Sequence, residues 1–175
     1  MVATEGRTAH RLLGEAVPEP PMNGTVTLYY ATNEPPIREP MLMLNGTGTG
    51  LVNSVMVMSE CSQDYAPAGQ SLISVSVLGI PNRTDEELQQ DVRTQLQEWY
   101  GSTVQTWRLL KIYRIPDALP DMAVGRLDPW QRPVRLRPGL YVCGDHRDQS
   151  SINGAMESGH RTAQAVAEDL AEKRC

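Results

Sequence analysis

The alternation of apolar and polar side chains predicts a sheet in the middle of the chain. Thr25–Ala31 and Ser71–Leu78 alternate with a period of two, which is typical of strands with one buried face. The apolar runs Met41–Leu44 and Leu51–Met58 flank the glycine-rich segment 45–50. This arrangement predicts a hairpin with a long turn, so we expect the central region to be rich in β-structure.

A helix is predicted over residues 84–100. Thr84 and Glu87 have the Thr-x-x-Glu spacing of a capping box, and Gly101 is suited to end the helix. Apolar residues spaced by four, four and three positions lie on one helical face: Leu88, Val92, Leu96 and Trp99. After this helix the chain is expected to return as a strand over Gln105–Ile115.

Both ends of the chain carry a strand followed by a helix in their patterns. Met1–Thr4 is typical of the end of an apolar strand, and Glu5–Leu13 predicts a short helix or turn. Leu140–Cys143 predicts a short buried strand. Ser150 or Ser151 is placed to cap a final helix of about 20 residues.

Residues 116–139 contain five prolines, and we expect little regular structure in them. We interpret this segment as a linker or an extended crossing between two structural units. The predicted fold class is α+β, with a β-rich sheet and a capping helix followed by a C-terminal strand–turn–helix.

Composition and charge exclude several classes of protein. The chain has 175 residues with 40% hydrophobic residues, enough to bury a core. Its net charge is -5 and it has no basic run, so no nucleic-acid partner is expected. It has neither an apolar stretch near the roughly 18 residues of a membrane span nor a secretory-type N-terminus. We expect a cytoplasmic or organelle-stroma location, and peripheral membrane contact stays open.

Most familiar motifs of catalysis and metal binding are missing. The Gly-x-Gly-x-Gly run at 46–50 lacks the Gly-x-Gly-x-x-Gly spacing and is followed by a strand pattern, which favours a turn. The histidines and the cysteines Cys61, Cys143 and Cys175 show no metal-ligand spacing, so no metal is expected. No catalytic acid, base or nucleophile can be nominated from the residues.

The C-terminal strand–turn–helix has more specific chemistry. Gly144 and Asp145 follow the predicted strand, and Ser151–Ala155 open the helix. A helix N-terminus presents unpaired N–H groups and partial positive charge, and small residues let a ligand approach the backbone. An aspartate at a strand end can accept hydrogen bonds from sugar or ribityl hydroxyls. By themselves these features also fit a generic strand–turn–helix.

Two segments here resemble a known family signature. Gly139–Asp145 and Ser151–Gly159 look like the C-terminal FAD-binding signature of the flavin amine oxidase/phytoene desaturase/protoporphyrinogen oxidase superfamily. Further stretches are similar to motifs of this superfamily or its desaturase-like branch: Val2–Gly6 with Leu12–Gly14, Tyr65–Leu72, and Tyr113–Pro120. The resemblance covers nearly the whole chain.

The resemblance implies an FAD-dependent oxidoreductase, a flavoprotein that removes a hydride from its substrate. Gly144 and Asp145 would lie beside the pyrophosphate and ribityl chain of FAD, and the amide of Ile152 would approach the pyrimidine end of the isoalloxazine. The other implied cofactor contacts are Ser151, Asn153, Gly154 and Ala155.

The resemblance also implies a division of the chain. Residues 1–21 would end one FAD-binding segment, 22–118 would form a substrate-domain-like β-rich region, and 119–175 would form the C-terminal FAD-binding segment. The sheet would be one wall of a pocket for a small-molecule substrate of apolar or mixed character. The parent family has an α/β FAD-binding domain, which would be incomplete in this chain.

This sequence departs from the family pattern at three points. The N-terminal Gly-x-Gly-x-x-Gly half is absent, so we interpret the chain as truncated, associating with a missing dinucleotide-binding half or with itself. Residues 25–30 contain no lysine, and Ser151 stands where an aromatic is common. Both departures favour a desaturase-like or uncharacterised branch of the superfamily over amine oxidation. The alternative is a non-catalytic α+β binding or interaction module derived from the family.

Overall fold

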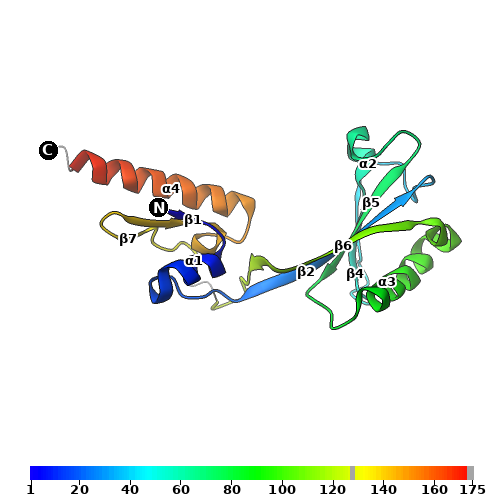
Figure 1. Cartoon of the computed structure of the whole chain (residues 1–175), viewed down its shortest axis with the longest axis horizontal. Helices are drawn as coiled ribbons and strands as arrows, with labels where there is room; N and C mark the ends of the chain where they lie inside the picture. Colours follow the sequence, from blue (N-terminus) through cyan, green and yellow to red (C-terminus); the bar gives the residue numbers. More distant parts are fainter. Residues whose placement is uncertain (127–128, 173–175) are drawn as a thin grey trace. The chain divides into compact units, whose positions relative to one another are not determined.

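The computed structural model describes residues 1–126 and 129–172. The chain forms two compact units, which we call unit 1 (residues 1–23 and 117–175) and unit 2 (residues 24–116). Figure 1 shows the order of their elements along the chain. Both units combine strands with helices, which confirms the expected α+β class.

Unit 2 is built on a five-stranded sheet with the order β3–β4–β5–β2–β6. The pairs β3–β4, β4–β5 and β5–β2 are antiparallel. The strands are β2 (Met22–Thr32), β3 (Leu42–Leu44), β4 (Val52–Val57), β5 (Ser71–Leu78) and β6 (Arg108–Pro120), and the short helical turns α2 (Met58–Cys61) and η2 (Gln63–Tyr65) follow β4. The strands predicted over β2 to β5, and the hairpin between β3 and β4, are confirmed.

Helix α3 (Asp85–Tyr100) packs against one face of this sheet (Figure 1). Its capping box is formed: the Glu87 amide donates to the Thr84 hydroxyl at 3.2 Å, and the Thr84 amide donates to the Glu87 carboxylate at 2.9 Å. The face toward the sheet buries Leu88, Val92 and Leu96 against strand residues that include Val26, Leu28, Ile73, Val75 and Val77. Trp99, predicted on the same face, remains 36% exposed.

The strand predicted over Gln105–Ile115 begins later than expected. Residues 101–106 form a 3-10 turn, η3 (Gly101–Thr106), and β6 begins at Arg108. The reason is the burial of Trp107, whose amide donates to the Val104 carbonyl at 3.2 Å. Arg93 of α3 donates to the carbonyls of both residues, so these backbone groups are satisfied without a sheet partner.

The expectation of little regular structure over residues 116–139 is partly wrong. Strand β6 continues through Pro116 to Pro120, and β7 (Arg135–Arg137) forms a further strand. Proline cannot donate to a ladder, but β6 is an edge strand of its sheet, where a missing donor is tolerated. The pairing of β7 with β8 (Leu140–Cys143) joins two very short segments, which have little local signal.

Unit 1 contains a three-stranded sheet with the order β1–β8–β7. Strand β1 (Val2–Ala3) is parallel to β8, with Val2 opposite Val142. The remaining elements are α1 (Gly6–Leu13) with the 3-10 turn η1 (Gly14–Ala16), η4 (Asp145–Arg147) and α4 (Ile152–Glu172). Figure 1 shows α1 and α4 on opposite sides of this sheet. The predicted first and last strands and helices are confirmed.

Helix α4 packs through small and polar residues. It buries Gly154, Ser158 and Thr162, whereas Ile152 is 82% and Met156 is 69% exposed. The fully buried apolar core of unit 1 is correspondingly small: Ala9, Val17 and Val142. In the part of the chain that the structure describes, no helix combines the length and apolarity needed to cross a membrane.

Candidate functional site

The carboxyl ends of β1 and β8 lie side by side because the two strands are parallel neighbours. Glu5 follows β1 and caps α1 by accepting hydrogen bonds from the amides of Arg7 and Thr8, both at 2.7 Å. Gly144 and Asp145 follow β8. The carboxyl edge of parallel strands is where open α/β sheets bind ligands, so this edge is the candidate site in unit 1.

Gly144 has no room for a side chain. Its φ is +151°, and a Cβ there would lie 2.5 Å from the Thr4 carbonyl oxygen and 2.6 Å from Nδ1 of His146. The Gly144 amide donates a hydrogen bond to the Ser158 hydroxyl at 3.0 Å. The same hydroxyl donates a hydrogen bond to the Gly144 carbonyl at 2.8 Å. Ser158 therefore ties the strand end directly to α4.

The N-terminus of α4 is partly capped. The Ser151 hydroxyl accepts a hydrogen bond from the Gly154 amide at 3.0 Å, and the Ser151 carbonyl accepts one from Ala155 at 2.9 Å. Within residues 1–126 and 129–172, the amides of Ile152 and Asn153 have no hydrogen-bond partner. Both residues are exposed, so their N–H groups and the positive end of the helix dipole are available to a ligand.

Gly154 packs against the turn before α4. A Cβ at this position would lie 1.9 Å from the Gln149 carbonyl oxygen, so the glycine allows the turn before α4 to pack against the helix. Gly154 is buried, unlike Asn153 beside it. Its direct contribution is thus to hold the turn that presents the amides of Ile152 and Asn153.

Asp145 and His146 share a low-polarity environment. Burial raises the pKa of Asp145, and the nearby Glu5 carboxylate acts in the same direction, while hydrogen bonds from backbone amides oppose it. His146 is 1% exposed. Burial lowers the pKa of His146 to about 4, helped by the positive charges of Arg147 and Arg132 and opposed by Glu5. Neither ring nitrogen has a hydrogen-bond partner within the described residues.

Lowering the pH should destabilise the folded chain through His146. The imidazole has an ordinary pKa of 6.5 when unfolded and about 4 when folded, so the unfolded chain binds more protons between these values. The stabilisation is complete above pH 6.5 and is lost as pH falls toward 4, by up to about 3 kcal/mol. His146→Gln should flatten the dependence of the unfolding free energy on pH in this window.

Denaturation of both forms at several pH values measures this difference. The raised pKa of Asp145 acts in the opposite direction, since its stabilisation is lost as pH rises through it, but it is present in both forms. Parallel pH profiles for wild type and His146→Gln would show that His146 does not titrate as the structure implies.

A buried ion pair fixes the turn between β8 and α4. Oδ2 of Asp148, which is 1% exposed, lies 2.9 Å from Nη2 of Arg161 in the middle of α4. The Arg161 guanidinium also donates to the carbonyls of Arg132 at 3.0 Å and Arg147 at 2.9 Å. Sequence reasoning missed His146, Asp148 and Arg161, because their roles depend on proximity between residues that are distant in the chain.

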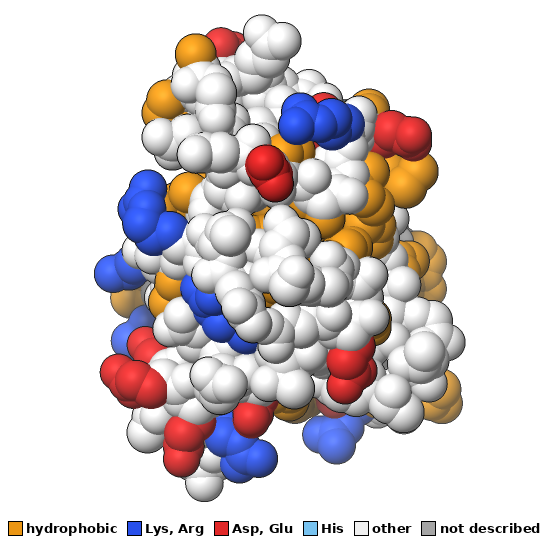
Figure 2. Space-filling view, turned by 90° about the vertical axis from the view of Figure 1, so that its right-hand side faces the viewer, with side chains coloured by type: hydrophobic (Ala, Val, Ile, Leu, Met, Phe, Trp, Pro, Cys, Tyr) orange, Lys and Arg blue, Asp and Glu red, His pale blue; other side chains and the backbone are white. Residues whose placement is uncertain are grey.

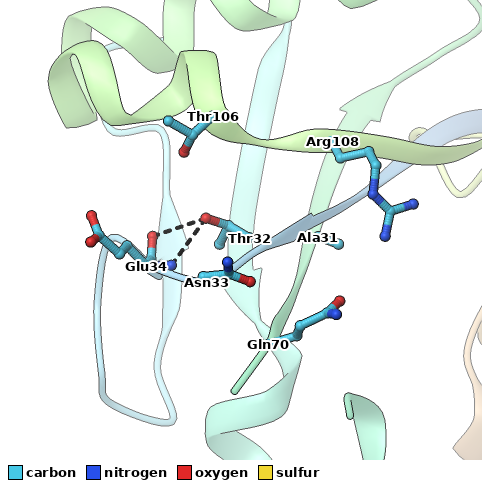
Figure 3. Close-up of a pocket in the computed structure, with 7 residues that line it drawn as sticks. All are labelled: Ala31, Thr32, Asn33, Glu34, Gln70, Thr106 and Arg108. Carbon is cyan, nitrogen blue, oxygen red and sulfur yellow. Dashed lines mark hydrogen bonds between the residues drawn. The ribbon is translucent and has the colours of Figure 1, made fainter. Parts of the chain in front are cut away.

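Unit 2 offers one depression on the face of its sheet away from α3 and another at the end of β2 and the start of β6. One has a volume of about 550 Å³ and is lined mainly by apolar residues: Thr27, Tyr29, Leu72, Leu110, Lys111, Tyr113 and Ile115. The rings of Tyr29 and Tyr113 meet edge to face, with centroids 5.9 Å apart. The other, of about 470 Å³, is more polar and includes Asn33, Glu34, Gln70 and Arg108 (Figure 3).

The surface of the molecule carries charges of both signs. In Figure 2, Lys and Arg side chains are interspersed with Asp and Glu, and hydrophobic side chains are exposed between them. The face shown there presents no continuous basic patch. Exposed large hydrophobic residues of unit 2 include Leu110, Tyr113 and Ile115.

The solved structures that resemble this chain include one oxidoreductase, one mutase and one Pyrococcus furiosus protein. An oxidoreductase from Methanosarcina mazei aligns with a TM-score of 0.62 at 18% identity, over 92% of this chain and 38% of its own. A Pyrococcus furiosus protein gives 0.53 at 11% identity, over 81% and 31%. A reduced UDP-galactopyranose mutase gives 0.52 at 14% identity, over 70% and 27%.

At these identities the structural likeness establishes the fold alone. This chain spans between 27% and 38% of the length of these structures. The comparison with curated proteins gives no match.

The family comparison covers both units. The model of the family described as "Flavin containing amine oxidoreductase" matches residues 2–167, a range that contains β1, the sheet of unit 2 and the turn from β8 into α4. This match confirms the resemblance and the flavin cofactor that the signature implied. The chain belongs to the flavin-containing amine oxidoreductase family.

Proposed function

We propose that unit 1 binds FAD at the carboxyl ends of β1 and β8, as the C-terminal part of an oxidoreductase that removes a hydride from an organic substrate. The observation that carries this proposal is that Asp145, directly after β8, and the unpartnered amides of Ile152 and Asn153, at the start of α4, flank the same connection between β8 and α4. The connection then offers an acceptor of hydroxyl hydrogen bonds at one end and a pair of donors for negative charge at the other.

The residues present fit the cofactor. Gly144 keeps the strand end free of a side chain, and Asp145 can accept hydrogen bonds from ribityl hydroxyls. The amides of Ile152 and Asn153 can donate to the pyrimidine end of the isoalloxazine, where the helix dipole favours negative charge. A bound flavin supplies the two-electron acceptor for the hydride. Ser151, Gly154 and Ala155 support this turn through its capping hydrogen bonds.

We assign the substrate side to the sheet of unit 2. Its face away from α3 is open and partly apolar, which suits a wall of a substrate pocket. In this proposal residues 1–21 and 119–175 contribute to the FAD-binding domain and residues 22–118 to the substrate domain. The absence of a lysine from residues 25–30 favours a desaturase-like reaction over amine oxidation.

The rest of the FAD-binding domain is proposed to be the partner of unit 1. The exposed side chains of Ile152 and Met156 on α4 and the small buried core of unit 1 support a need for further packing. A dinucleotide-binding half with the Gly-x-Gly-x-x-Gly turn would supply the contacts to the ADP part of the cofactor. Without it, we expect the chain to bind FAD weakly and to associate or be poorly soluble.

Replacing Asp145 with alanine should weaken FAD binding at least about tenfold, a loss of about 1.4 kcal/mol, because the ribityl hydroxyls lose their acceptor. Asp145→Asn keeps one acceptor oxygen and should lose less. Titration of the full chain into FAD, followed by flavin fluorescence anisotropy, measures these affinities.

Asp64→Ala is the matched control, because Asp64 is an exposed carboxylate in unit 2. Equal affinities of Asp145→Ala and Asp64→Ala would reject the proposed site. A wild-type chain without affinity for FAD would favour the alternative function, a non-catalytic module derived from the family.

A further inference from the structure

The apolar depression of unit 2 lies on the sheet face away from α3, and the polar depression lies at the end of β2 and the start of β6. On β2 the side chains of Tyr30 and Leu28 point into the core, so Tyr29 and Ala31 share the opposite face. Ala31 is paired with Leu72 of β5. The apolar depression is lined by Tyr29 and Leu72. The polar one is lined by Ala31, two positions further along β2, and by Gln70, which immediately precedes β5.

The same step of two residues links the depressions on β6. Leu110 lines the apolar depression, and Arg108 lines the polar one. Figure 3 shows the guanidinium of Arg108, at the start of β6, and the amide of Gln70, just before β5, extending beside Ala31. The apolar surface formed by tyrosine and leucine side chains therefore borders the polar side chains of Arg108 and Gln70.

The two basic side chains at these depressions, Arg108 and Lys111, are not neutralised by acidic partners in the part of the chain that the structure describes. Among the residues described, Arg108 and Lys111 form neither a salt bridge nor a side-chain hydrogen bond. The apolar depression is lined by no acidic residue. The polar depression does include Glu34, but Figure 3 shows its carboxylate on the side away from the Arg108 guanidinium.

An unpaired guanidinium beside an apolar surface is suited to one kind of small molecule. Arginine presents parallel N–H donors that match a carboxylate in a bidentate contact. The edge-to-face pair Tyr29–Tyr113 and the exposed side chains of Leu110 and Ile115 offer contact area to an apolar body. Lys111 adds positive charge at the same face.

We propose that this face binds an anionic amphipathic substrate, whose apolar body lies on Tyr29, Tyr113 and Leu110 and whose carboxylate is held by Arg108 and Gln70. This inference rests on the proposed function, because it assigns the substrate class of the oxidoreductase. The binding step itself requires only residues of unit 2 and no cofactor.

A series of probes with one apolar body and different charges tests the assignment. The full chain is titrated by calorimetry with 2-naphthoate, 2-naphthalenemethanol and 2-naphthylmethylamine. We expect 2-naphthoate to bind tightest. Arg108→Gln should weaken 2-naphthoate binding about five- to tenfold and leave 2-naphthalenemethanol unchanged. Tyr113→Ser should weaken all probes that bind.

The control is Arg83→Gln, because Arg83 is an exposed arginine that pairs with Asp91 of α3 and lines neither depression. It should leave all affinities unchanged. Equal binding of 2-naphthoate to wild type and Arg108→Gln, or tighter binding of the amine, would overturn the proposal. Self-association that Tyr113→Ser abolishes, with no probe bound, would identify a second copy of the chain as the occupant and also overturn it.

The two proposals fail separately. Asp145→Ala should leave the affinity for 2-naphthoate unchanged, because Asp145 belongs to unit 1. If the chain does not bind 2-naphthoate but Asp145→Ala still weakens FAD binding, only the proposed substrate class is rejected. Intact probe binding in a chain with no affinity for FAD would reject only the FAD site.

Discussion

Gly154→Ala is expected to destabilise unit 1 by about 3 kcal/mol. The added Cβ would lie 1.9 Å from the Gln149 carbonyl oxygen, a backbone atom that cannot move aside as the end of a side chain could. The turn before α4 would have to shift, and with it the amides of Ile152 and Asn153. Hydrogen exchange of the β8 and α4 amides, measured by mass spectrometry, gives the opening free energy of this unit separately from unit 2.

Gly159→Ala is the matched control, because Gly159 lies in the same helix with no atom within 4 Å of the position of its Cβ. Alanine is the better helix former, so this variant should be neutral or more stable by up to about 1 kcal/mol. FAD affinity should fall in Gly154→Ala and be kept in Gly159→Ala. Equal exchange rates in the two variants would show that the turn is not packed on α4 as described.

Asp148→Ala is expected to cost about 3 kcal/mol of stability in unit 1. The substitution leaves the Arg161 guanidinium without its carboxylate partner. Removing one member of a buried ion pair costs far more stability than the intact pair contributes, because the other charge is left uncompensated. It also removes the acceptor for the Gln149 amide, which donates to Oδ1 of Asp148 at 2.9 Å. The same exchange experiment on β8 and α4 measures the effect.

An exposed ion pair of unit 1 provides the comparison. Glu19 lies 3.2 Å from Nε of Arg7, with side-chain exposures of 53% and 45%. Glu19→Ala should therefore change stability by less than about 1 kcal/mol. A loss in Asp148→Ala no larger than that in Glu19→Ala would contradict the claim that the Asp148–Arg161 pair holds the turn.

The elements that sequence reasoning predicted well are those with local signals. The capping box at Thr84 and the alternation in Ser71–Leu78 each depend on residues within a few positions of one another. The start of β6 could not be predicted in this way, because it depends on burial of Trp107 and on hydrogen bonds from Arg93 in another element. The pairing of β7 is likewise non-local.

The buried face of helix α4 does not coincide with its large apolar residues. Its large apolar residues Ile152 and Met156 point to solvent, while Gly154, Ser158 and Thr162 are buried. Small residues are needed there because the helix lies close to the strand end and the turn, and two of them hydrogen-bond the β8 region. The buried face of α4 is therefore determined by how closely its backbone approaches β8 and the turn, and not by the hydrophobicity of its side chains.

The candidate site was predictable only in part. The turn at Gly144 and Asp145 and the start of α4 at Ser151 could be singled out from a local signature. The unpartnered state of the Ile152 and Asn153 amides follows from where Ser151 caps the helix, which requires the structure.

The central claim is that the carboxyl edge of β1 and β8 with the start of α4 binds the flavin. The measurement that tests it most directly is the visible difference spectrum of the wild-type chain during titration with FAD. We expect a saturable perturbation of the flavin absorption bands. An unperturbed spectrum at FAD concentrations on the order of 1 mM would contradict it.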